Sequence, residues 1–288
     1  MRAMVLAAGL GSRLQPLTHH QPKPLVTVAG RPMLEYILRA LRHYGVAEVI
    51  LNSHHLAQQL HDYMATAGAD ILGEIPYRLL YEPTILETGG GVKNALPWLG
   101  DGPFFVINGD SFWDEQNLLA RLADGFDSAT MGALLVMVPP QRVVASSVGA
   151  GDFIAMADHG AVSNDNRGNP RRGDASHDHK NNDGPVAIRR VGAGNMIGDK
   201  TGSKMIATDY RPEVFCGIQL LTAQPFGSVK DDIFSLNVIY DQLIAGGVQQ
   251  PDDRQDKKGL YGLSLRGQFF TVGTMADKLL VEQALGFG

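Results

Sequence analysis

The sequence predicts an α/β fold in which a doubly wound, mostly parallel mixed sheet lies between two layers of helices. Short apolar runs alternate with segments of helical periodicity through the first half of the chain, a pattern typical of parallel strands joined by helices. Of the 288 residues, 44% are hydrophobic, which is enough for a substantial core. We therefore expect a single three-layer domain over residues 1–288.

The expected elements follow one another along the chain. Ala3–Ala8 is expected to be the first, buried strand. Pro32 can begin a helix whose apolar residues recur at i, i+3, i+4 and i+7 from Leu34 to Leu41, and Gly45 can end it. Further strands are expected at residues 48–51, 77–81, 104–108, 133–138, 214–221, 260–265 and 269–272. Further helices are expected at residues 56–66, 92–99, 118–123, 233–245 and 276–285.

The alternation stops between about Ser163 and Asp209, where polar and charged residues replace the periodic apolar ones. Stretches of more than ~15 residues without regular structure are uncommon inside compact domains. We therefore expect residues 163–209 to form a polar surface insertion.

Composition restricts the partners and the compartment. The net charge of −5 and the pI near 6.0 give no basic field for nucleic acid, so we expect a small-molecule partner. The lone Cys216 cannot form an internal disulfide, which suits a reducing compartment such as the cytoplasm. The apolar start is too short for a signal peptide, and no run approaches the ~20 residues that span a bilayer. We expect a cytoplasmic protein with neither a nucleic-acid nor a membrane partner.

Three polar segments directly follow predicted strands, at the edge where open α/β sheets bind ligands. The first is Gly9–Arg13, with Lys23 farther along. Its glycines let backbone N–H groups approach phosphate oxygens, while Arg13 and Lys23 supply positive charge. By itself, this pattern also fits an ordinary turn between a strand and a helix.

The other two segments support a nucleotide site. Leu86–Gly91 places three glycines after a polar pair, which allows backbone groups to line a flat base but also fits a flexible loop before a helix. Asn108-Gly109-Asp110 follows a buried strand, where a carboxylate is well placed to hold Mg²⁺. Three such segments at successive strand ends favour a nucleotide site over unrelated turns.

Two other nucleotide-binding motifs do not fit. The position of the third glycine in a dinucleotide-binding G-x-G-x-x-G is Leu14 here, and three nearby prolines, Pro16, Pro22 and Pro24, stand where the phosphate-binding helix would begin. The chain also lacks the G-x-x-x-x-G-K-[ST] of a P-loop.

The order and spacing of these motifs resemble the sugar-1-phosphate nucleotidyltransferase family. The resemblance rests on Leu6-Ala-Ala-Gly-x-Gly-x-Arg-Leu-x-Pro-Leu-Thr18, Pro22-Lys-Pro-Leu25 and Asn108-Gly-Asp110. Further motifs look most like the members that transfer a uridylyl group to N-acetylmuramate 1-phosphate in cell-wall (peptidoglycan) recycling. These motifs are Gly30-x-Pro32, Leu86–Gly91, Gly151-Asp-Phe153, Phe215-x-Gly-Ile218 and Val272-Gly-Thr274.

The resemblance implies the Rossmann-like fold of nucleotide-diphospho-sugar transferases. It also implies transfer from a nucleoside triphosphate, here UTP, to a sugar 1-phosphate, with Mg²⁺ as cofactor and pyrophosphate released. By the resemblance, the nucleotide is bound by Leu6, Ala7, Gly9, Gly11, Ser12, Arg13, Glu87, Thr88 and Gly89. The sugar phosphate is bound by Lys23, Gly151, Phe215 and Gly217, and the catalytic residues are Arg13, Lys23 and the metal ligand Asp110.

One position departs from the family pattern. Members usually carry a second metal-binding aspartate two residues before the late Gly-Thr, where this chain has Thr271. Either Asp110 holds the metal together with phosphate oxygens and waters, or another acid reaches the site. Because of Thr271, a nucleotide-binding regulator without turnover stays open as an alternative. Guanylyl transfer to a mannose or heptose phosphate also stays open, because such enzymes use the same core loops.

Overall fold

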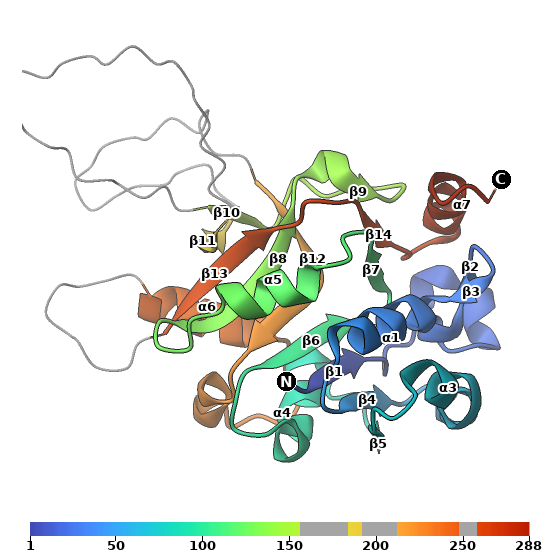
Figure 1. Ribbon diagram of the computed structural model, residues 1–288, viewed down its shortest axis with the longest axis horizontal. Coiled ribbons are helices and arrows are strands. Elements are labelled where there is room, and N and C mark those ends of the chain that lie inside the picture. The colour runs from blue at the N-terminus through green and yellow to red at the C-terminus, as the bar shows by residue number, and fades with distance from the viewer. Residues whose placement is uncertain (156–183, 192–211, 248–257, 288) are drawn as a thin grey trace, which may run out of the picture.

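A computed structural model describes residues 1–155, 184–191, 212–247 and 258–287. In these residues, a nine-stranded sheet in the order β10-β11-β13-β8-β12-β6-β1-β4-β5 forms the middle layer (Figure 1). Its strands are β1 (Ala3–Leu6), β4 (Val49–Ser53), β5 (Tyr77–Tyr81), β6 (Phe104–Asn108), β8 (Met131–Val138), β10 (Phe153–Ala155), β11 (Val186–Arg190), β12 (Val214–Leu221) and β13 (Gly259–Ser264).

The sheet is mixed, as predicted. Strands β6, β1, β4 and β5 are parallel neighbours, and β8 is parallel to β13. Antiparallel β12 separates these two groups, and β10 and β11 add antiparallel pairs at one edge. The parallel character is therefore strongest in the N-terminal half, where the ends of β1, β4 and β6 meet at one edge of the sheet.

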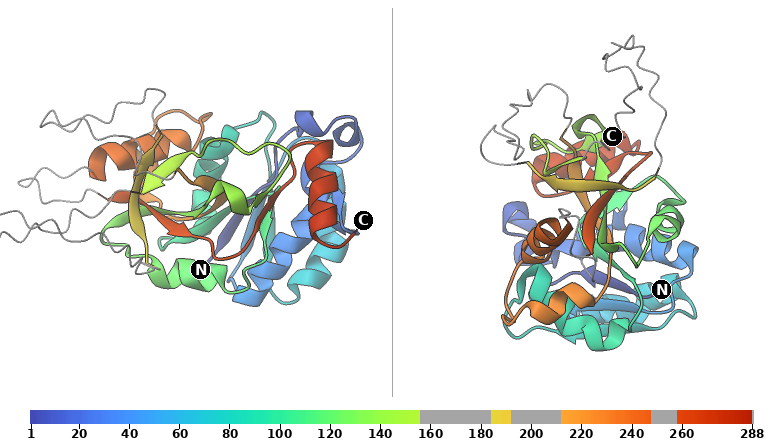
Figure 2. Two further views of the ribbon diagram at one scale, coloured as in Figure 1. Left: turned by 90° about the horizontal axis from the view of Figure 1, so that it is seen from above. Right: turned by 90° about the vertical axis from the view of Figure 1, so that its left-hand side faces the viewer.

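Helices cover both faces of this sheet (Figure 2). One face packs against α1 (Met33–Tyr44), α2 (Ala57–Tyr63), α3 (Ala69–Leu72) and α5 (Leu118–Gly125). The other packs against α4 (Glu87–Leu99) and α6 (Asn237–Gly247). Successive residues of β8 alternate between the two cores: Leu134 and Val136 belong to the first, Leu135 and Met137 to the second. This two-sided burial explains why the buried strands are continuous apolar runs.

Helix α1 has the boundaries and the buried face that its periodicity predicts. Leu34, Ile37, Leu38 and Leu41 are all 0% exposed. Gly45 ends the helix in the left-handed region at φ 80°, and its N–H donates to carbonyls of the last turn. A glycine suits this position because it has no Cβ to strain the left-handed conformation.

A small second sheet stands beside the main one. It consists of β7 (Ser111–Trp113), β14 (Phe269–Thr271) and β9 (Val143–Val144). Phe112 stacks between Tyr36 and Phe270, with ring centroids 4.5 and 5.3 Å away. This third core also includes residues of α7 (Met275–Ala284), which Figure 1 shows beside the pair β2 (Thr27–Val28) and β3 (Arg31–Pro32).

Short helical turns join several of these elements. Among the described residues, five are 3-10 turns: Ser12–Leu14, Leu17–His19, Lys23–Leu25, Pro140–Arg142 and Gln224–Ser228. Met64–Gly68 is a π turn that joins α2 to α3.

Three expectations from the sequence are corrected by the structure. Helix α4 begins at Glu87, five residues before the expected start, and ends at Leu99 as expected, with Pro97 inside it. Helix α6 begins at Asn237 instead of 233. Within the expected insertion at 163–209, residues 186–190 form β11, which pairs with β10 and β13. The other residues of that segment, apart from 184, 185 and 191, lie outside the described ranges.

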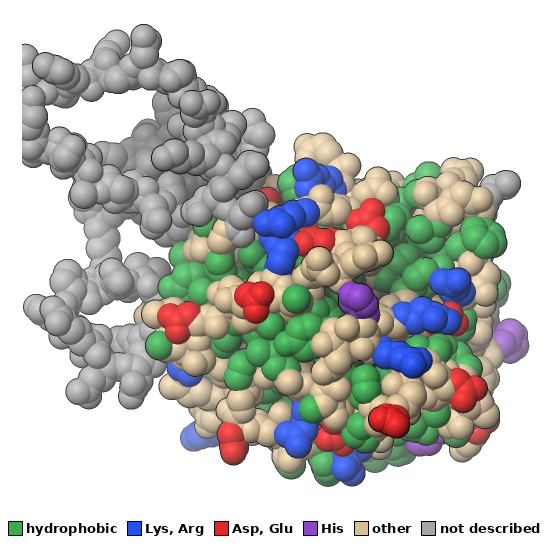
Figure 3. All heavy atoms as spheres, in the orientation of Figure 1, with side chains coloured by type: hydrophobic (Ala, Val, Ile, Leu, Met, Phe, Trp, Pro, Cys, Tyr) green, Lys and Arg blue, Asp and Glu red, His purple; other side chains and the backbone are tan. Residues whose placement is uncertain are grey.

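On the face drawn in Figure 3, acidic and basic side chains of the described residues are interspersed. Among the described residues, no helix has the length and apolar character that crossing a bilayer requires.

Candidate active site

A cavity of about 460 Å³ lies at the edge of the sheet where β1, β4 and β6 end. Several residues proposed from the sequence line it: Leu6, Ala7, Gly9, Gly11, Ser12, Arg13, Lys23, Glu87, Thr88 and Asp110. Its wall also includes Ala8, Leu10, Pro24, Asn52, Glu82, Ile85, Asn108, Gly109 and Gly273. The volume is in the range of small-molecule sites.

The segment Gly9–Arg13, which we call the glycine loop, presents backbone donors to this cavity. In the described part of the chain, no hydrogen bond is made by the amides of residues 9–13. The carbonyl of Gly11 instead accepts from Leu14 N at 2.8 Å and from Thr18 Oγ1 at 2.9 Å. Unpaired amides in a turn of this kind form a concave site for an anion.

The two glycines of the loop serve different needs. A Cβ on Gly9 would meet nothing within 4 Å, because the residue faces the open cavity. A Cβ on Gly11 would lie 2.8 Å from Thr18 Cγ2 and 3.0 Å from Lys23 Cβ, and its φ is +64°. Gly11 is therefore required by packing and by its left-handed conformation.

The charged residues proposed from the sequence meet in this cavity. Lys23 Nζ forms an ion pair with Asp110 Oδ2, and the two side chains are only 13% and 25% exposed. The exposed Arg13 has no hydrogen-bond or ion-pair partner among the described residues. Its guanidinium Cζ lies 3.4 Å from where a Cβ on Gly273 would be. Arg13 is thus available to a ligand, while Lys23 and Asp110 balance each other.

A buried polar network that the sequence analysis missed supports the opposite wall. Asn52 Oδ1 accepts from Ala7 N at 2.7 Å, and Asn52 Nδ2 donates to Glu82 Oε1 at 2.7 Å. Glu82 Oε2 accepts from Leu86 N at 3.1 Å. Asn52 and Glu82 are 3% and 1% exposed, so the network fixes the ends of β1, β4 and β5 against the start of α4. The sequence signal for this network was Asn52, a polar residue directly after the apolar Ile50-Leu51.

The three glycines of Leu86–Gly91 do not form the ligand-lining loop that we expected. They lie in the first turns of α4, and Gly89 does not line the cavity. The amides of Gly89 and Gly90 both donate to Phe234 O, at 2.8 and 3.0 Å. A Cβ on Gly90 would lie 2.1 Å from Asp232 O. The glycines therefore let residues 232–236 pack closely on the helix.

Glu87 and Thr88 remain at the cavity wall. Glu87 has φ +63°, a conformation that non-glycine residues rarely adopt outside special sites. Thr88 Oγ1 accepts a hydrogen bond from Leu236 N at 2.9 Å. The wall at the start of α4 is thus fixed by contacts with the segment before α6.

Of the residues proposed for the sugar phosphate, Lys23 lines this cavity, whereas the other three lie next to it without lining it. A Cβ on Gly217 would lie 2.5 Å from Nδ2 of Asn108, which lines the cavity. Phe215 N donates to Asp152 Oδ2 at 2.9 Å, directly after Gly151. Gly151, Phe215 and Gly217 therefore surround the start of β12, one strand away from β6.

Thr271 lies beside Asp110 in the small sheet. It is paired in register with Ser111, the residue after Asp110. Another acid near the end of β14 is Asp277, and both of its oxygens accept hydrogen bonds: Oδ1 accepts from Ser146, and Oδ2 accepts from the amides of Gly273 and Thr274. Burial alone would raise the pKa of Asp277, but these hydrogen bonds hold it below its ordinary value. Asp277 therefore caps α7 and is not available to a metal.

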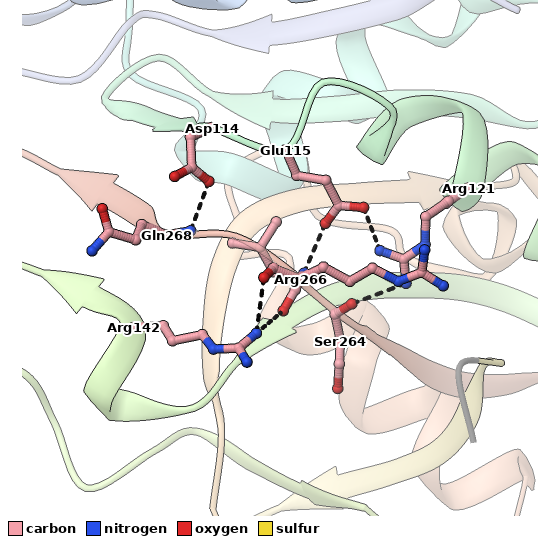
Figure 4. Close-up of polar contacts among 8 residues, drawn as sticks. Asp114, Glu115, Arg121, Arg142, Ser264, Arg266 and Gln268 are labelled. Carbon is pink, nitrogen blue, oxygen red and sulfur yellow. Dashed lines mark hydrogen bonds and ion pairs between the residues drawn. The ribbon is translucent and has the colours of Figure 1, made fainter. Parts of the chain in front are cut away.

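Four charged side chains form hydrogen bonds with the backbone of the turn before β14 (Figure 4). Arg142 Nη1 donates to the carbonyls of residues 265 and 266 at 3.1 and 3.0 Å, and Arg121 Nη2 donates to Ser264 O at 3.1 Å. Glu115 accepts from the amide of residue 266, and Asp114 from that of residue 268, both at 2.7 Å. These contacts fix the start of β14, which pairs Thr271 with Ser111 and leads to Gly273 in the cavity wall.

Comparison with known proteins gives a family and a fold. A family model described as a MobA-like NTP transferase domain matches residues 3–163. The chain is 43% identical over 139 residues to N-acetylmuramate alpha-1-phosphate uridylyltransferase of Caulobacter vibrioides, covering 47% of this chain and 57% of that protein. The same enzyme of Neisseria meningitidis serogroup B is 41% identical over 117 residues, with coverages of 40% and 48%. The chain thus spans about half the length of the curated relatives it matches.

Two solved structures share the fold over nearly the whole chain. HddC from Yersinia pseudotuberculosis complexed with GMP-PN has a TM-score of 0.61 at 18% identity and covers 99% of each chain. UTP-bound UGPase from Acinetobacter baumannii has a TM-score of 0.67 at 20% identity, covering 99% of this chain and 93% of that one.

Proposed function

The chain belongs to the MobA-like NTP transferase family, and on that basis we propose that it transfers a nucleotidyl group from a nucleoside triphosphate to a sugar 1-phosphate. One observation carries the proposal: a single cavity joins the Lys23–Asp110 pair to the amides of the glycine loop and the Arg13 guanidinium, which have no partner among the described residues. Amide donors and a guanidinium suit a triphosphate, and a carboxylate at the same place suits its metal.

The chemistry of this transfer asks for positioning and charge stabilisation. An oxygen of the sugar phosphate attacks the α-phosphorus, the bond from that phosphorus to the oxygen bridging to the β-phosphate breaks, and pyrophosphate leaves with the electron pair. The attacking oxygen is already ionised at neutral pH, so no side chain has to remove a proton. The protein must therefore hold the reactants in line and offset the charge that develops on pyrophosphate.

The cavity residues suit these two tasks. The amides of the glycine loop and the Arg13 guanidinium would bind the phosphates that leave as pyrophosphate. Lys23 forms an ion pair with Asp110 in the same cavity and would contact the reacting phosphates. Asn108 lines the cavity and contacts Gly217, which would connect the nucleotide to a sugar phosphate near the start of β12.

The residues present fit a Mg²⁺ that is held mainly by substrate. Among the described residues, no cluster of three or more acids, histidines or cysteines could hold a metal by itself. Asp110 lines the cavity, whereas the oxygens of Glu82 and Asp277 are occupied by protein donors. Mg²⁺ commonly uses one or two carboxylates with substrate phosphates and water. Asp110 would be its protein ligand, and the bound ion would supply charge stabilisation at the phosphates.

For the substrate pair we propose UTP and N-acetylmuramate 1-phosphate, with a role in cell-wall sugar recycling in the cytoplasm. The support is the motif pattern together with the two uridylyltransferases that are 43% and 41% identical over part of the chain. A heptose 1-phosphate guanylyltransferase of Campylobacter jejuni is 35% identical over 114 residues, so GTP with a heptose or mannose phosphate is the competing pair.

Pyrophosphate release from a panel of substrate pairs tests this proposal. UTP, GTP, CTP and ATP are each combined with N-acetylmuramate, mannose and heptose 1-phosphates in the presence of Mg²⁺. We expect the highest kcat/KM for UTP with N-acetylmuramate 1-phosphate. A guanylyl pair as the best substrate would overturn the choice of substrates, and nucleotide binding with no release from any pair would favour a regulator without turnover.

A further inference from the structure

Two adjacent histidines lie outside the cavity and contact the backbone on two sides of it: that of Glu82 in the cavity wall and that of Thr18 behind the glycine loop. His54 and His55 follow β4, are partly buried and do not line the cavity. His54 Nδ1 lies 2.7 Å from Glu82 O, and His55 Nε2 lies 2.8 Å from Thr18 O. A carbonyl oxygen only accepts, so both of these ring nitrogens must carry the hydrogen. One dipeptide therefore donates to two segments far apart in the chain.

His55 acts on the glycine loop through Thr18. Thr18 is 1% exposed, and its hydroxyl donates to Gly11 O at 2.9 Å while its carbonyl accepts from His55. With the bond from Leu14 N, the carbonyl of Gly11 has two donors inside the protein. That arrangement keeps the negative end of the carbonyl dipole away from a bound phosphate and leaves the amides of the loop for it.

His54 acts on the wall at the start of α4 through the backbone of Glu82. The amide of Glu82 donates to Ser53 O at 2.8 Å, and its carbonyl accepts from His54. The carboxylate of Glu82 accepts hydrogen bonds from Asn52 Nδ2 and Leu86 N. A displacement of this backbone would move both contacts, and with them the wall from Glu82 to Glu87.

We propose that His54 and His55 are positioning residues for nucleotide binding. His55 sets the glycine loop for the triphosphate, and His54 sets the wall that receives the rest of the nucleotide. The inference rests on the proposed nucleotide site and assigns separate tasks to the two rings. Each ring acts through one donated hydrogen bond, so each can be replaced by an amide that keeps the donor.

The test compares donor removal with donor replacement in the full chain. His55→Leu and His54→Leu remove the donors, whereas His55→Gln and His54→Asn place an amide N–H near the lost Nε2 or Nδ1. The matched control is His61→Leu: His61 Nε2 contacts Ser53 Oγ at 3.2 Å, close to the same strand end but touching neither wall. Dissociation constants are measured by calorimetry for Mg²⁺–UTP and for inorganic tripolyphosphate, alongside KM values and unfolding midpoints.

The two probes separate the two walls. We expect His55→Leu to raise the dissociation constants of both UTP and tripolyphosphate by about 10-fold, the scale of one hydrogen bond. His54→Leu should raise the dissociation constant of UTP by a similar factor and leave that of tripolyphosphate unchanged. The amide variants should bind within about 3-fold of wild type, and the KM for the sugar phosphate should stay constant in all of them. A merely structural role would lower the unfolding midpoint and the active fraction without this pattern.

Other outcomes overturn the inference. Unchanged affinities in both leucine variants, equal losses in His61→Leu, or no recovery in the amide variants would each do so. Thr18→Val tests the same relay independently of the rings, because it keeps the side-chain shape and removes only the donor to Gly11; it should match His55→Leu on both probes. Wild-type protein that binds no nucleotide would instead refute the proposed function.

Discussion

Replacing Gly90 with alanine tests whether the glycines of α4 serve packing. The new Cβ would lie 2.1 Å from Asp232 O and 3.0 Å from Leu86 Cβ, and a backbone carbonyl cannot move aside as a flexible side chain can. Overpacking of this kind costs up to about 3 kcal/mol, and the better helix propensity of alanine offsets about 1 kcal/mol. We expect the free energy of unfolding to fall by about 2 kcal/mol and the thermal midpoint by about 4 °C.

Gly9→Ala is the matched control. Its Cβ would meet nothing within 4 Å, so the midpoint should stay within about 1 °C of wild type. That Cβ projects into the cavity, however, and should raise the KM for the triphosphate about 10-fold, which corresponds to ~1.4 kcal/mol. Scanning calorimetry and pyrophosphate release measure the two effects. An unchanged midpoint in Gly90→Ala, or a loss of nucleotide affinity there without loss of stability, would refute the packing role.

Three further predictions concern charge. Arg13→Ala should lower kcat by about 10²–10³ in steady-state assays, and Arg13→Lys should recover little because an ammonium lacks the planar fork; near-normal turnover would remove Arg13 from the mechanism. Thr271→Asp places a carboxylate opposite Ser111, next to Asp110, and should lower the Mg²⁺ concentration for half-maximal turnover about 10-fold; an unchanged Mg²⁺ titration would count against this position as a ligand site. Burial raises the pKa of Glu213 above its ordinary 4.5, so the folded state binds its proton more tightly than the unfolded state does, and stability is lost as pH rises through the folded pKa. Glu213→Gln should therefore be more stable than wild type at pH 7 and show no such gain at pH 4 in denaturant titrations, and equal stability at both pH values would contradict the burial argument.

The sequence predicted most of the large sheet because its strands are buried on both faces. Val214–Leu221 and Phe104–Asn108 have the expected boundaries, and the apolar stripe of α1 faces the core as its period requires. Such elements carry a local signal in every residue. In the small sheet, β14 was expected at residues 269–272, whereas β7 and β9 have only three and two residues, too few for an alternating pattern, and were missed.

Only part of the site was predicted from the sequence, because some of its residues show their role by their type and others only through their neighbours in the fold. The glycine loop, Lys23 and Asp110 carry their chemistry in the residue types themselves, and they meet in one cavity. A run of glycines does not say whether the missing Cβ makes room for a ligand or for protein. At Gly89 and Gly90 the neighbours are Phe234 and Asp232, which only the fold brings near. The buried role of Glu82 was hidden likewise, because its donors come from β4 and from Leu86, the residue before α4.

The most direct test of the account is the formation of an NDP-sugar by wild type and by Asp110→Asn. Mass spectrometry follows the product at saturating UTP, N-acetylmuramate 1-phosphate and Mg²⁺. Asn keeps the shape of the side chain and removes the charge that pairs with Lys23 and would hold the metal. We predict UDP-sugar and pyrophosphate in equal amounts from wild type, and a rate lower by about 10²–10³ in the variant. No NDP-sugar from wild type, or equal rates in the two proteins, would contradict the account.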